Sequence, residues 1–450
     1  MQSLREGFAS CSYKVLESQH GFPKRVPLQQ NRIQVFEKIA HRCPSGRQTV
    51  KVSANTSAAT LEKLTSATRM PSLPFVKVAE QEDMKLALML NVIDPTIGGV
   101  LIMGERGTGK SVAVRAMVDL LPEIEVVAED AFNSHPTDTK LMGPDVLQRH
   151  RNGEQLPMVR VKTPLVELPL GATEDRICGT INIEKALQEG VKAYEPGLLA
   201  KANRGILYVD EVNLLDDGLV DVVLDSSASG VNTVEREGIG IVHPAKFIMI
   251  GSGNPQARTC PPPQLLDRFG MSVNVATMQN IAARTRMVLD RIAFENDPDA
   301  FCVEAEEEQA ALRAQLTAAT EAAPGIAMAR ELKVTISEIC SLLDVDGIRG
   351  DITTNKAARA LAAFESKDTV TIDHVRRVIG LCLNHRLRKD PLETIDSGTK
   401  VALAFRRITD PQRAAKEEKA KKEAEAAAAK AAEKANKKAG AWGGLPGPKR

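Results

Sequence analysis

Residues 100–111, VLIMGERGTGKS, decide the fold of this 450-residue chain. The four apolar residues 100–103 indicate a short buried strand, and the run that follows matches GxxxxGKS, a phosphate-binding loop between a strand and a helix. The context supports this, because residues 112–121 have a helical pattern and Pro122 then ends it. The sequence therefore predicts an α/β fold built around a nucleotide-binding loop.

The loop supplies the groups that phosphate recognition requires. Backbone amides of a glycine-rich turn and of a helix N-terminus attract phosphate oxygens. We expect Lys110 to reach the β- and γ-phosphates and the Ser111 hydroxyl to help hold Mg²⁺. The predicted nucleotide-binding residues of the loop are Gly104, Glu105, Arg106, Gly107, Thr108, Gly109, Lys110 and Ser111.

Two further apolar runs end in polar residues suited to hydrolysis. Residues 206–209, ILYV, are followed by Asp210 and Glu211, and a strand over 247–250 leads through GSG to Asn254. Ligands of open α/β sheets gather at the carboxyl ends of the strands. We expect Asp210 to support Mg²⁺, Glu211 to orient or deprotonate the attacking water, and Asn254 to hydrogen-bond water and the γ-phosphate.

Phosphoryl transfer needs positive charge beyond the metal and the loop lysine. Two arginines that follow the acidic motif are candidates: Arg268 in QLLDRFG and Arg349 in DGIRGD. An isolated arginine is more often part of a surface ion pair. The order of these two after both ATPase motifs favours a catalytic role.

Composition excludes several other classes. The chain is 43% hydrophobic and 26% charged, and no apolar run approaches the roughly 20 residues that a membrane helix needs. Seven scattered cysteines without a CxxC pair, and seven histidines without an i, i+4 pair, encode neither a disulfide scaffold nor a zinc site. Residues 1–70 carry +7 and 411–450 carry +6, so residues 71–410 carry −12. That acidic middle disfavours nucleic acid as a partner.

The motifs, in this order and at this spacing, resemble those of the AAA+ ATPases, and within them the I-subunit family of magnesium chelatase. The resemblance covers roughly residues 73–408. The stretches that carry it are 84–111, 179–217, 232–238, 251–255, 264–270, 345–351 and 381–398.

The resemblance implies an AAA+ nucleotide domain with a parallel sheet, followed by a smaller all-helical lid, and a ring, a hexamer, with ATP between neighbouring subunits. The implied roles are Walker A for Lys110 and Ser111, Walker B for Asp210 and Glu211, sensor 1 for Asn254, arginine finger toward the neighbour's ATP for Arg268, and sensor 2, in the lid, for Arg349.

The resemblance also implies partners and a location. The ring works with a D subunit and a porphyrin-binding H subunit to insert Mg²⁺ into protoporphyrin IX, on the route to chlorophyll in the chloroplast stroma. ATP and the Mg²⁺ of MgATP are the implied cofactors. Only 3% of this chain is aromatic, which argues against a porphyrin pocket here and favours the role of motor.

We predict five segments along the chain. Residues 134–170, rich in proline and charge, are predicted to be an inserted hairpin or loop within the nucleotide domain. The segments are a plastid transit peptide or disordered extension over 1–70, the ATPase domain over 71–280, a helical connector over 281–325, the helical lid over 326–408, and an Ala/Lys/Glu-rich helical tail with a disordered end over 411–450.

Some readings stay open. Residues 256–262, QARTCPP, depart from the acidic connector expected before the finger. Two other functions compete: a MoxR-type AAA+ remodeller of protein complexes, and a weakly active regulatory isoform of the chelatase ring. Cys340 and Cys382 resemble a redox-sensitive pair of plastid relatives, and two buried lid cysteines are the alternative.

Overall fold

A computed structural model describes the chain over residues 72–78, 80–182, 193–236, 239–254, 263–277, 279–387 and 396–410. The predicted transit peptide, the connector over 256–262 and the tail over 411–450 lie outside these residues. The bounds predicted for the five segments therefore stay predictions.

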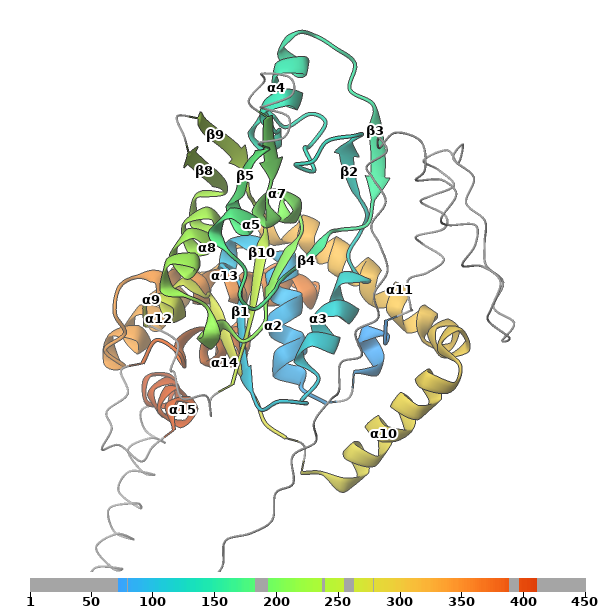
Figure 1. Cartoon of the computed structure of the whole chain (residues 1–450). Helices are drawn as coiled ribbons and strands as arrows, with labels where there is room; N and C mark the ends of the chain where they lie inside the picture. The colour runs from blue at the N-terminus through green and yellow to red at the C-terminus, as the bar shows by residue number, and fades with distance from the viewer. Residues whose placement is uncertain are drawn as a thin grey trace, which may run out of the picture. The chain divides into compact units, whose positions relative to one another are not determined.

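A five-stranded parallel sheet forms the centre of the described chain (Figure 1). All four neighbouring pairs are parallel. The strand order is β11 (Met271–Val275), β1 (Val100–Gly104), β10 (Ile248–Gly253), β7 (Ile206–Val209) and β4 (Leu165–Leu168). This confirms the predicted α/β class with a parallel sheet.

The apolar strands bury both faces of the sheet. Successive side chains of a strand point to opposite faces. In β1, Val100 and Ile102 belong to one buried cluster and Leu101 to the other. The first cluster takes in α2 (Glu82–Ile93) and α3 (Lys110–Val118); the second takes in α5 (Glu174–Cys178), α7 (Leu198–Ala202) and α8 (Asp217–Ser229). Continuous apolar runs such as VLIM and ILYV are typical of strands covered in this way.

The prediction for 134–170 is wrong at its C-terminal end. β3 (Met158–Val161) pairs antiparallel with β2 (Ile124–Val127), which precedes the predicted segment, and α4 (Pro144–Arg151) lies between them in the sequence. The next strand, β4, is instead an edge of the central sheet, paired with β7. Its first two residues are only partly buried and it is flanked by prolines, so its sequence gives a weak strand signal.

β10 is also longer than predicted, because it continues through Gly251, Ser252 and Gly253. The two glycines are required by packing. A Cβ at Gly251 would lie 2.7 Å from the Phe269 ring, and one at Gly253 would lie 2.6 Å from the Met103 sulfur. The run was predicted to be a loop because glycine usually weakens strands, whereas here close neighbours demand it.

Smaller elements decorate the sheet. Two further antiparallel pairs are β5 (Gly179–Asn182) with β6 (Ala193–Pro196), and β8 (Val231–Arg236) with β9 (Ile239–Pro244). The 3₁₀ helices are η1 (Phe75–Lys77), η2 (Pro95–Ile97), η3 (Thr139–Leu141), η4 (Val212–Leu214) and η5 (Ala323–Gly325). A short helix, α9 (Pro263–Arg268), precedes β11.

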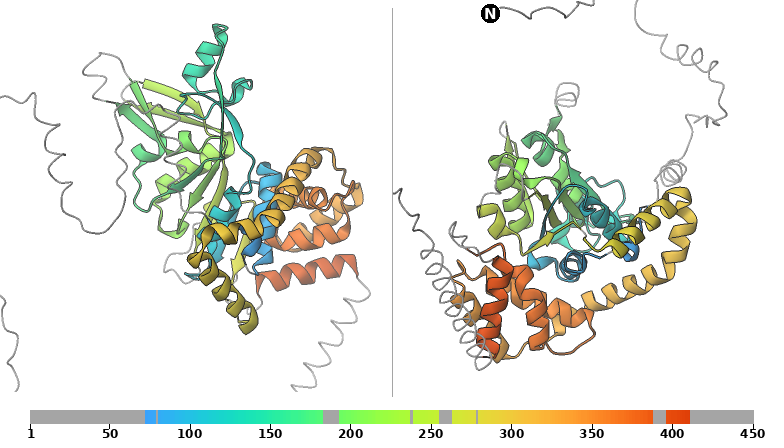
Figure 2. Two further views of the ribbon diagram at one scale, coloured as in Figure 1. Left: turned by 90° about the vertical axis from the view of Figure 1, so that its right-hand side faces the viewer. Right: turned by 90° about the horizontal axis from the view of Figure 1, so that it is seen from below.

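The C-terminal part is helical. α10 (Ile281–Asn296) and α11 (Pro298–Ala322) lead to the lid helices α12 (Arg330–Leu342), α13 (Arg349–Phe364), α14 (Ile372–Leu383) and α15 (Ser397–Thr409), and α11 runs between α10 and the lid (Figure 2). The lid shares the buried cluster of α2 and β1, and both α11 and α13 contact α2. One continuous core therefore joins the lid to the sheet.

We predict that Leu88→Ala destabilises the sheet and the lid together. Leu88 of α2 is 1% exposed within the shared core, and truncating a buried leucine costs about 2–5 kcal/mol. Urea unfolding followed by circular dichroism should show one transition at a lower midpoint. Leu170→Ala, at a residue that is 55% exposed, is the matched control and should change stability by less than about 0.5 kcal/mol. Equal losses for the two variants would contradict the shared core.

Candidate functional site

The phosphate-binding loop follows β1 at the carboxyl edge of the sheet. Gly104 ends the strand, and a Cβ there would lie 2.5 Å from the Val275 carbonyl oxygen of β11, so only glycine fits. Gly107 and Gly109 have φ of 79° and 82°, in the region that favours glycine, and no atom lies within 4 Å of where their Cβ would be. The loop is therefore an open turn of backbone that a phosphate group can approach closely.

Lys110 begins α3 and folds back over the loop. Its ammonium donates to the carbonyl oxygens of Gly104 at 2.5 Å and Glu105 at 3.0 Å. Burial lowers the pKa of Lys110, and the carboxylates of Asp210 and Glu211 oppose that change. The loop thus holds a cation close to the acidic residues at the end of β7.

A chain of hydroxyl groups joins the loop to Asp210. The Ser111 hydroxyl lies 3.0 Å from the Tyr208 hydroxyl, which donates to Asp210 Oδ1 at 3.1 Å. Ser252 of β10 donates to the same oxygen at 2.5 Å. Ser111 and Asp210, the two predicted ligands of Mg²⁺, are therefore linked through one intervening phenol.

Glu211 is held in an unusual backbone conformation. Its φ of 50° and ψ of 57° are left-handed, which costs a non-glycine residue roughly 1–2 kcal/mol. Its amide donates to the Ser252 hydroxyl at 3.1 Å, and the Arg106 guanidinium pairs with Glu211 Oε1 at 2.8 Å. Arg106 is 77% exposed, so this ion pair is weak and exchangeable. Seven other non-glycine residues in the described part of the chain also have a positive φ, so the ion pair and the hydrogen bond, rather than the backbone, distinguish Glu211.

Neighbouring residues complete this edge. Asn254 follows β10, and its backbone carbonyl oxygen accepts a hydrogen bond from the side-chain amide of Asn213 at 3.0 Å. The Gln81 amide donates to the Thr108 carbonyl oxygen at 2.7 Å, and Thr277 donates to Glu105 Oε2 at 2.5 Å. The loop is thus tied to segments on both sides of it in the sequence.

The two predicted arginines lie at the amino ends of the strands, which we call the arginine edge, and the loop lies at the carboxyl ends. Arg268 ends α9, shortly before Met271, which pairs with Val100 at the start of β1. Arg349 pairs with Asp267 Oδ2 at 2.7 Å, so it lies at that same edge. The length of β1, about 13 Å, separates this edge from the loop. The structure therefore places neither arginine at the phosphate-binding loop of its own chain.

Asp267 is shared by two arginines. Its second oxygen, Oδ1, pairs with Arg386, a buried residue that also donates to the Phe269 carbonyl oxygen at 2.8 Å. His385 contacts the same carbonyl oxygen through Nε2 at 3.0 Å. A cavity of about 1090 Å³ opens here, and Arg268, Arg349 and Arg386 are among its lining residues. This arginine edge is a basic, partly hollow surface.

Three residues with clear contacts in the site were not predicted. Tyr208 was read only as a strand residue, but alternation along β7 places it on the face toward α3. Ser252 was read as part of a loop. Asp267 stands directly before Arg268 in the quoted motif, and this position beside a predicted site residue was the only feature of the sequence that could have indicated it. The contact of Asp267 with Arg386 joins residues 119 positions apart, and no local pattern shows it.

The residues present fit a nucleotide with Mg²⁺. The open backbone turn, the helix N-terminus and Lys110 are suited to phosphate, and the hydroxyl and carboxylate oxygens of Ser111 and Asp210 are ligands that Mg²⁺ prefers. In the described part of the chain, this edge included, no group of three or more His, Cys, Asp or Glu side chains is placed to hold a metal ion. Among the same residues, no helix has the length and apolar character needed to cross a membrane.

The two lid cysteines are free thiols. Cys340 and Cys382 are both buried, and burial raises the pKa of each to about 12. In this conformation both stay protonated at neutral pH, and a protonated thiol is a poor nucleophile. This arrangement agrees with the alternative of two buried lid cysteines. Redox sensitivity of the pair stays a hypothesis.

Comparisons with known proteins agree with these features. A family model described as "Magnesium chelatase, subunit ChlI" matches residues 180–293, and one described as "AAA lid domain" matches residues 333–405. The second match falls on α12–α15 and confirms the predicted helical lid.

Similar proteins extend the match over most of the chain. A relative from Cyanophora paradoxa named "Magnesium-chelatase subunit ChlI" is 60% identical over 75% of this chain and 97% of its own length. One from Oryza sativa subsp. indica, named as chloroplastic, is 59% identical over 74% of this chain and 80% of its own. A solved model of a complex between magnesium-chelatase subunits BchI and BchD is 44% identical, covers 71% of this chain and 98% of that chain, and has a TM-score of 0.42.

We predict that His385 makes folding sensitive to mild acid. Burial, together with Arg386, lowers the pKa of His385 to about 4, whereas an unfolded histidine titrates near 6.5. Between these values the unfolded chain binds more protons, so stability falls as pH falls; from pH 7 to pH 5 the loss is about 2 kcal/mol. His385→Gln, whose amide can still donate to Phe269, should lose less stability over this range in urea unfolding.

The matched control for that variant is His150→Gln, at an exposed histidine of α4. It should keep the acid sensitivity of the natural chain. The explanation fails if His385→Gln and the natural chain lose the same free energy of unfolding between pH 7 and pH 5.

Proposed function

Because the chain belongs to the family of magnesium-chelatase subunit ChlI, we propose that it is the ATP-hydrolysing motor subunit of a magnesium chelatase, which drives insertion of Mg²⁺ into protoporphyrin IX. The observation that carries this is identity of 59–60% with relatives of that name over nearly their whole length, together with a complete set of P-loop and acidic residues in the site. ATP is the substrate of the motor, and the porphyrin and the inserted Mg²⁺ belong to the assembled enzyme.

The residues at the carboxyl edge suit ATP hydrolysis. The backbone amides of the loop and Lys110 bind the phosphates, and Ser111 and Asp210 hold Mg²⁺, which when bound offsets charge on the β- and γ-phosphates. Once Glu211 has left its ion pair with Arg106, Glu211 orients the attacking water and accepts the proton of that water. Asn254 positions the γ-phosphate and the water. These roles are proposals that the hydrogen bonds from Ser252 and Tyr208 support.

Arg268 and Arg349 act on the ATP of a neighbouring subunit in this proposal. Both lie at the edge of the sheet opposite to the chain's own loop, and they are joined through the adjacent α9 residue Asp267. A head-to-tail ring brings the arginine edge of one subunit to the loop of the next. Cations that arrive with the neighbour stabilise charge in the transition state. The resemblance supports a hexamer as the closed ring.

The remaining assignments follow the family. The D subunit and the porphyrin-binding H subunit are the proposed partners, and the chloroplast stroma is the proposed location. Relatives from rice named as chloroplastic support the plastid. The proposed division of labour leaves the porphyrin to the H subunit.

The competing functions are less well supported. A MoxR-type remodeller would share the ATPase motifs but not identity near 60% with magnesium-chelatase subunits over most of the chain. A weakly active regulatory isoform would be expected to lose part of the hydrolytic set. Lys110, Asp210, Glu211 and Asn254 are all present and lie at one edge of the sheet.

We predict that residues 71–450, mixed with D and H subunits, MgATP and protoporphyrin IX, form Mg-protoporphyrin, measured by its fluorescence. Arg268→Ala should reduce the rate by about 10³-fold, the usual value of a catalytic arginine supplied by a neighbour. Glu211→Gln should abolish ATP turnover and metallation together. ATP hydrolysis without metallation favours the remodeller, and an ATP turnover that Glu211→Gln leaves unchanged favours the regulatory isoform.

A mixing experiment tests whether Arg268 acts on a neighbour. Chains with Arg268→Ala lack the cation, and chains with Lys110→Ala lack the nucleotide site, so each alone should be inactive. In rings formed from equal amounts of both, about one quarter of the sites combine an intact loop with an intact arginine from the next chain. ATP turnover should therefore return to at most about one quarter of the natural rate. No recovery would mean that Arg268 acts within its own chain.

A further inference from the structure

α10 carries an apolar stripe that no described part of the chain covers. One side of the helix packs on α11, where Phe294 meets Phe301 edge to face. The stripe lies on the other side, at the helical spacing i, i+7, i+8 and i+11. Its members are Ile281, Val288, Leu289 and Ile292, which are 81%, 52%, 61% and 49% exposed. Four large apolar side chains in one exposed row are typical of a contact surface.

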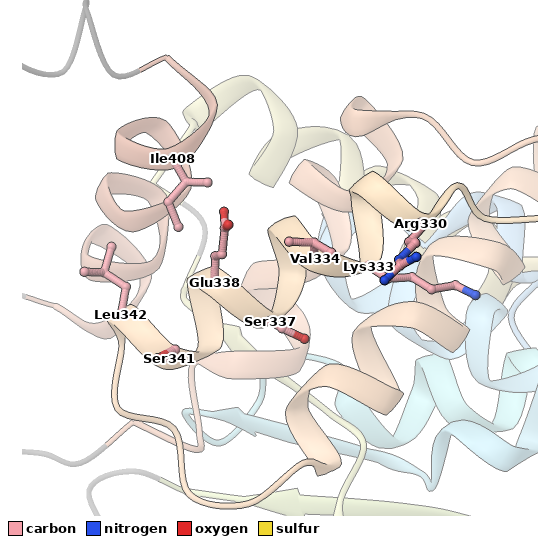
Figure 3. A pocket seen from close by; sticks show the side chains of 8 residues that line it. All are labelled: Arg330, Lys333, Val334, Ser337, Glu338, Ser341, Leu342 and Ile408. Carbon is pink, nitrogen blue, oxygen red and sulfur yellow. The ribbon is translucent and has the colours of Figure 1, made fainter.

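The lid has a groove of matching character between α12 and α15. Figure 3 shows Val334, Glu338 and Leu342 of α12 on one side and Ile408 of α15 facing them. The groove has a volume of about 950 Å³, and Val334 and Leu342 are 49% and 47% exposed. Arg330 lies toward its other end. A groove with an apolar floor and a few charged groups is the kind of surface that accepts an amphipathic helix.

The stripe and the groove are held apart within one chain. α11 joins them, with α10 at its first turn and α12 shortly after its last (Figure 2, right). Its 25 residues form a helix about 37 Å long. The C-terminal half of α11 is fixed by the core it shares with α2 and α13. The two surfaces are complementary and separate, which is the condition for a head-to-tail contact between copies.

We propose that the apolar stripe of α10 docks into the α12–α15 groove of a second copy of this chain. The proposal rests on the head-to-tail ring of the proposed function and names a contact within it. α10 leaves the sheet beside the phosphate-binding loop, where Thr277 contacts Glu105, while the lid contributes Arg349 at the arginine edge. Joining the loop of one copy to the arginines of the next therefore brings α10 toward the neighbour's lid.

One pair of opposite charges suits this occupant. Arg284 lies at the edge of the stripe, and Glu338 is the one carboxylate among the lining residues of the groove, which also include Arg330 and Lys333. Neither Arg284 nor Glu338 forms an ion pair with any residue that the structure describes. Opposite charges placed beside matching apolar surfaces favour one docking register over others. Residues 411–450 follow α15 directly, but their Ala, Lys and Glu composition offers no large apolar row to fill the groove.

Cysteine cross-linking tests the contact in the full chain. Leu289→Cys and Leu342→Cys chains, mixed and oxidised with MgATP present, should form a disulfide-linked dimer, and neither chain alone should do so above the background of the native cysteines. Leu170→Cys mixed with Leu342→Cys is the control at an exposed site outside both surfaces. Deleting residues 411–450 should leave the yield unchanged. A yield that rises several-fold on deletion would assign the groove to the tail and overturn the proposal.

Charge exchange gives a second readout that does not depend on cross-linking. Arg284→Glu should weaken self-assembly about tenfold in analytical ultracentrifugation, and Glu338→Arg should do the same, because each places like charges together. The double variant should return to within about threefold of the natural chain. Additive losses in the double variant would overturn the contact.

The two proposals can fail separately. If the Arg268→Ala and Lys110→Ala mixture regains activity but the cysteine pair gives no dimer, the head-to-tail ring stands and the α10 contact is overturned. If the natural chain neither assembles nor hydrolyses ATP, both the proposed function and this contact are overturned.

Discussion

The parallel pairing of β1 with both β10 and β11 is the constraint on which the rest of the molecule depends. It fixes the phosphate-binding loop at one edge of the sheet, beside Asp210 and the end of β10, and fixes Arg268 at the other. Hydrogen-bonded strands cannot shift by fractions of a residue, so the two halves of the chemistry are separated by the length of a strand. In the proposed mechanism, a complete site therefore takes its arginines from a second copy of the chain.

The buried strands and the loop could be predicted from the sequence because their signals are local. VLIM and ILYV are covered on both faces, and such strands are continuous apolar runs. β4 was missed because it lies at an edge, is half-buried and has no such run. The glycines of β10 led to the wrong prediction of a loop where the strand continues. They are small because Phe269 and Met103 pack against them, and these two contacts join residues that are far apart in the sequence.

The roles of the site residues stay predictions; the resemblance already directed Arg268 toward a neighbour's ATP, but it did not predict that Arg349 lies at the same end of the strands. Each motif indicates a role, whereas the distance between motifs depends on how the chain crosses the sheet. Arg349 shows this most clearly, because the sequence places it in a lid and only its contact with Asp267 shows which edge that lid covers. Contacts between residues far apart in sequence, such as Asp267 with Arg386, leave no periodic pattern to detect.

The two oxygens of Asp267 have unequal partners, and this asymmetry matters for release. Arg386 is buried and tied to the Phe269 carbonyl oxygen, whereas Arg349 is about half exposed. If Arg349 swings away toward an incoming anion, Asp267, which is itself about half exposed, stays paired with Arg386, so the buried charge of Arg386 keeps its counterion. The exchange then avoids the several kcal/mol that an uncompensated buried charge costs. Arg349 can therefore leave Asp267 for an arriving anion at little energetic cost.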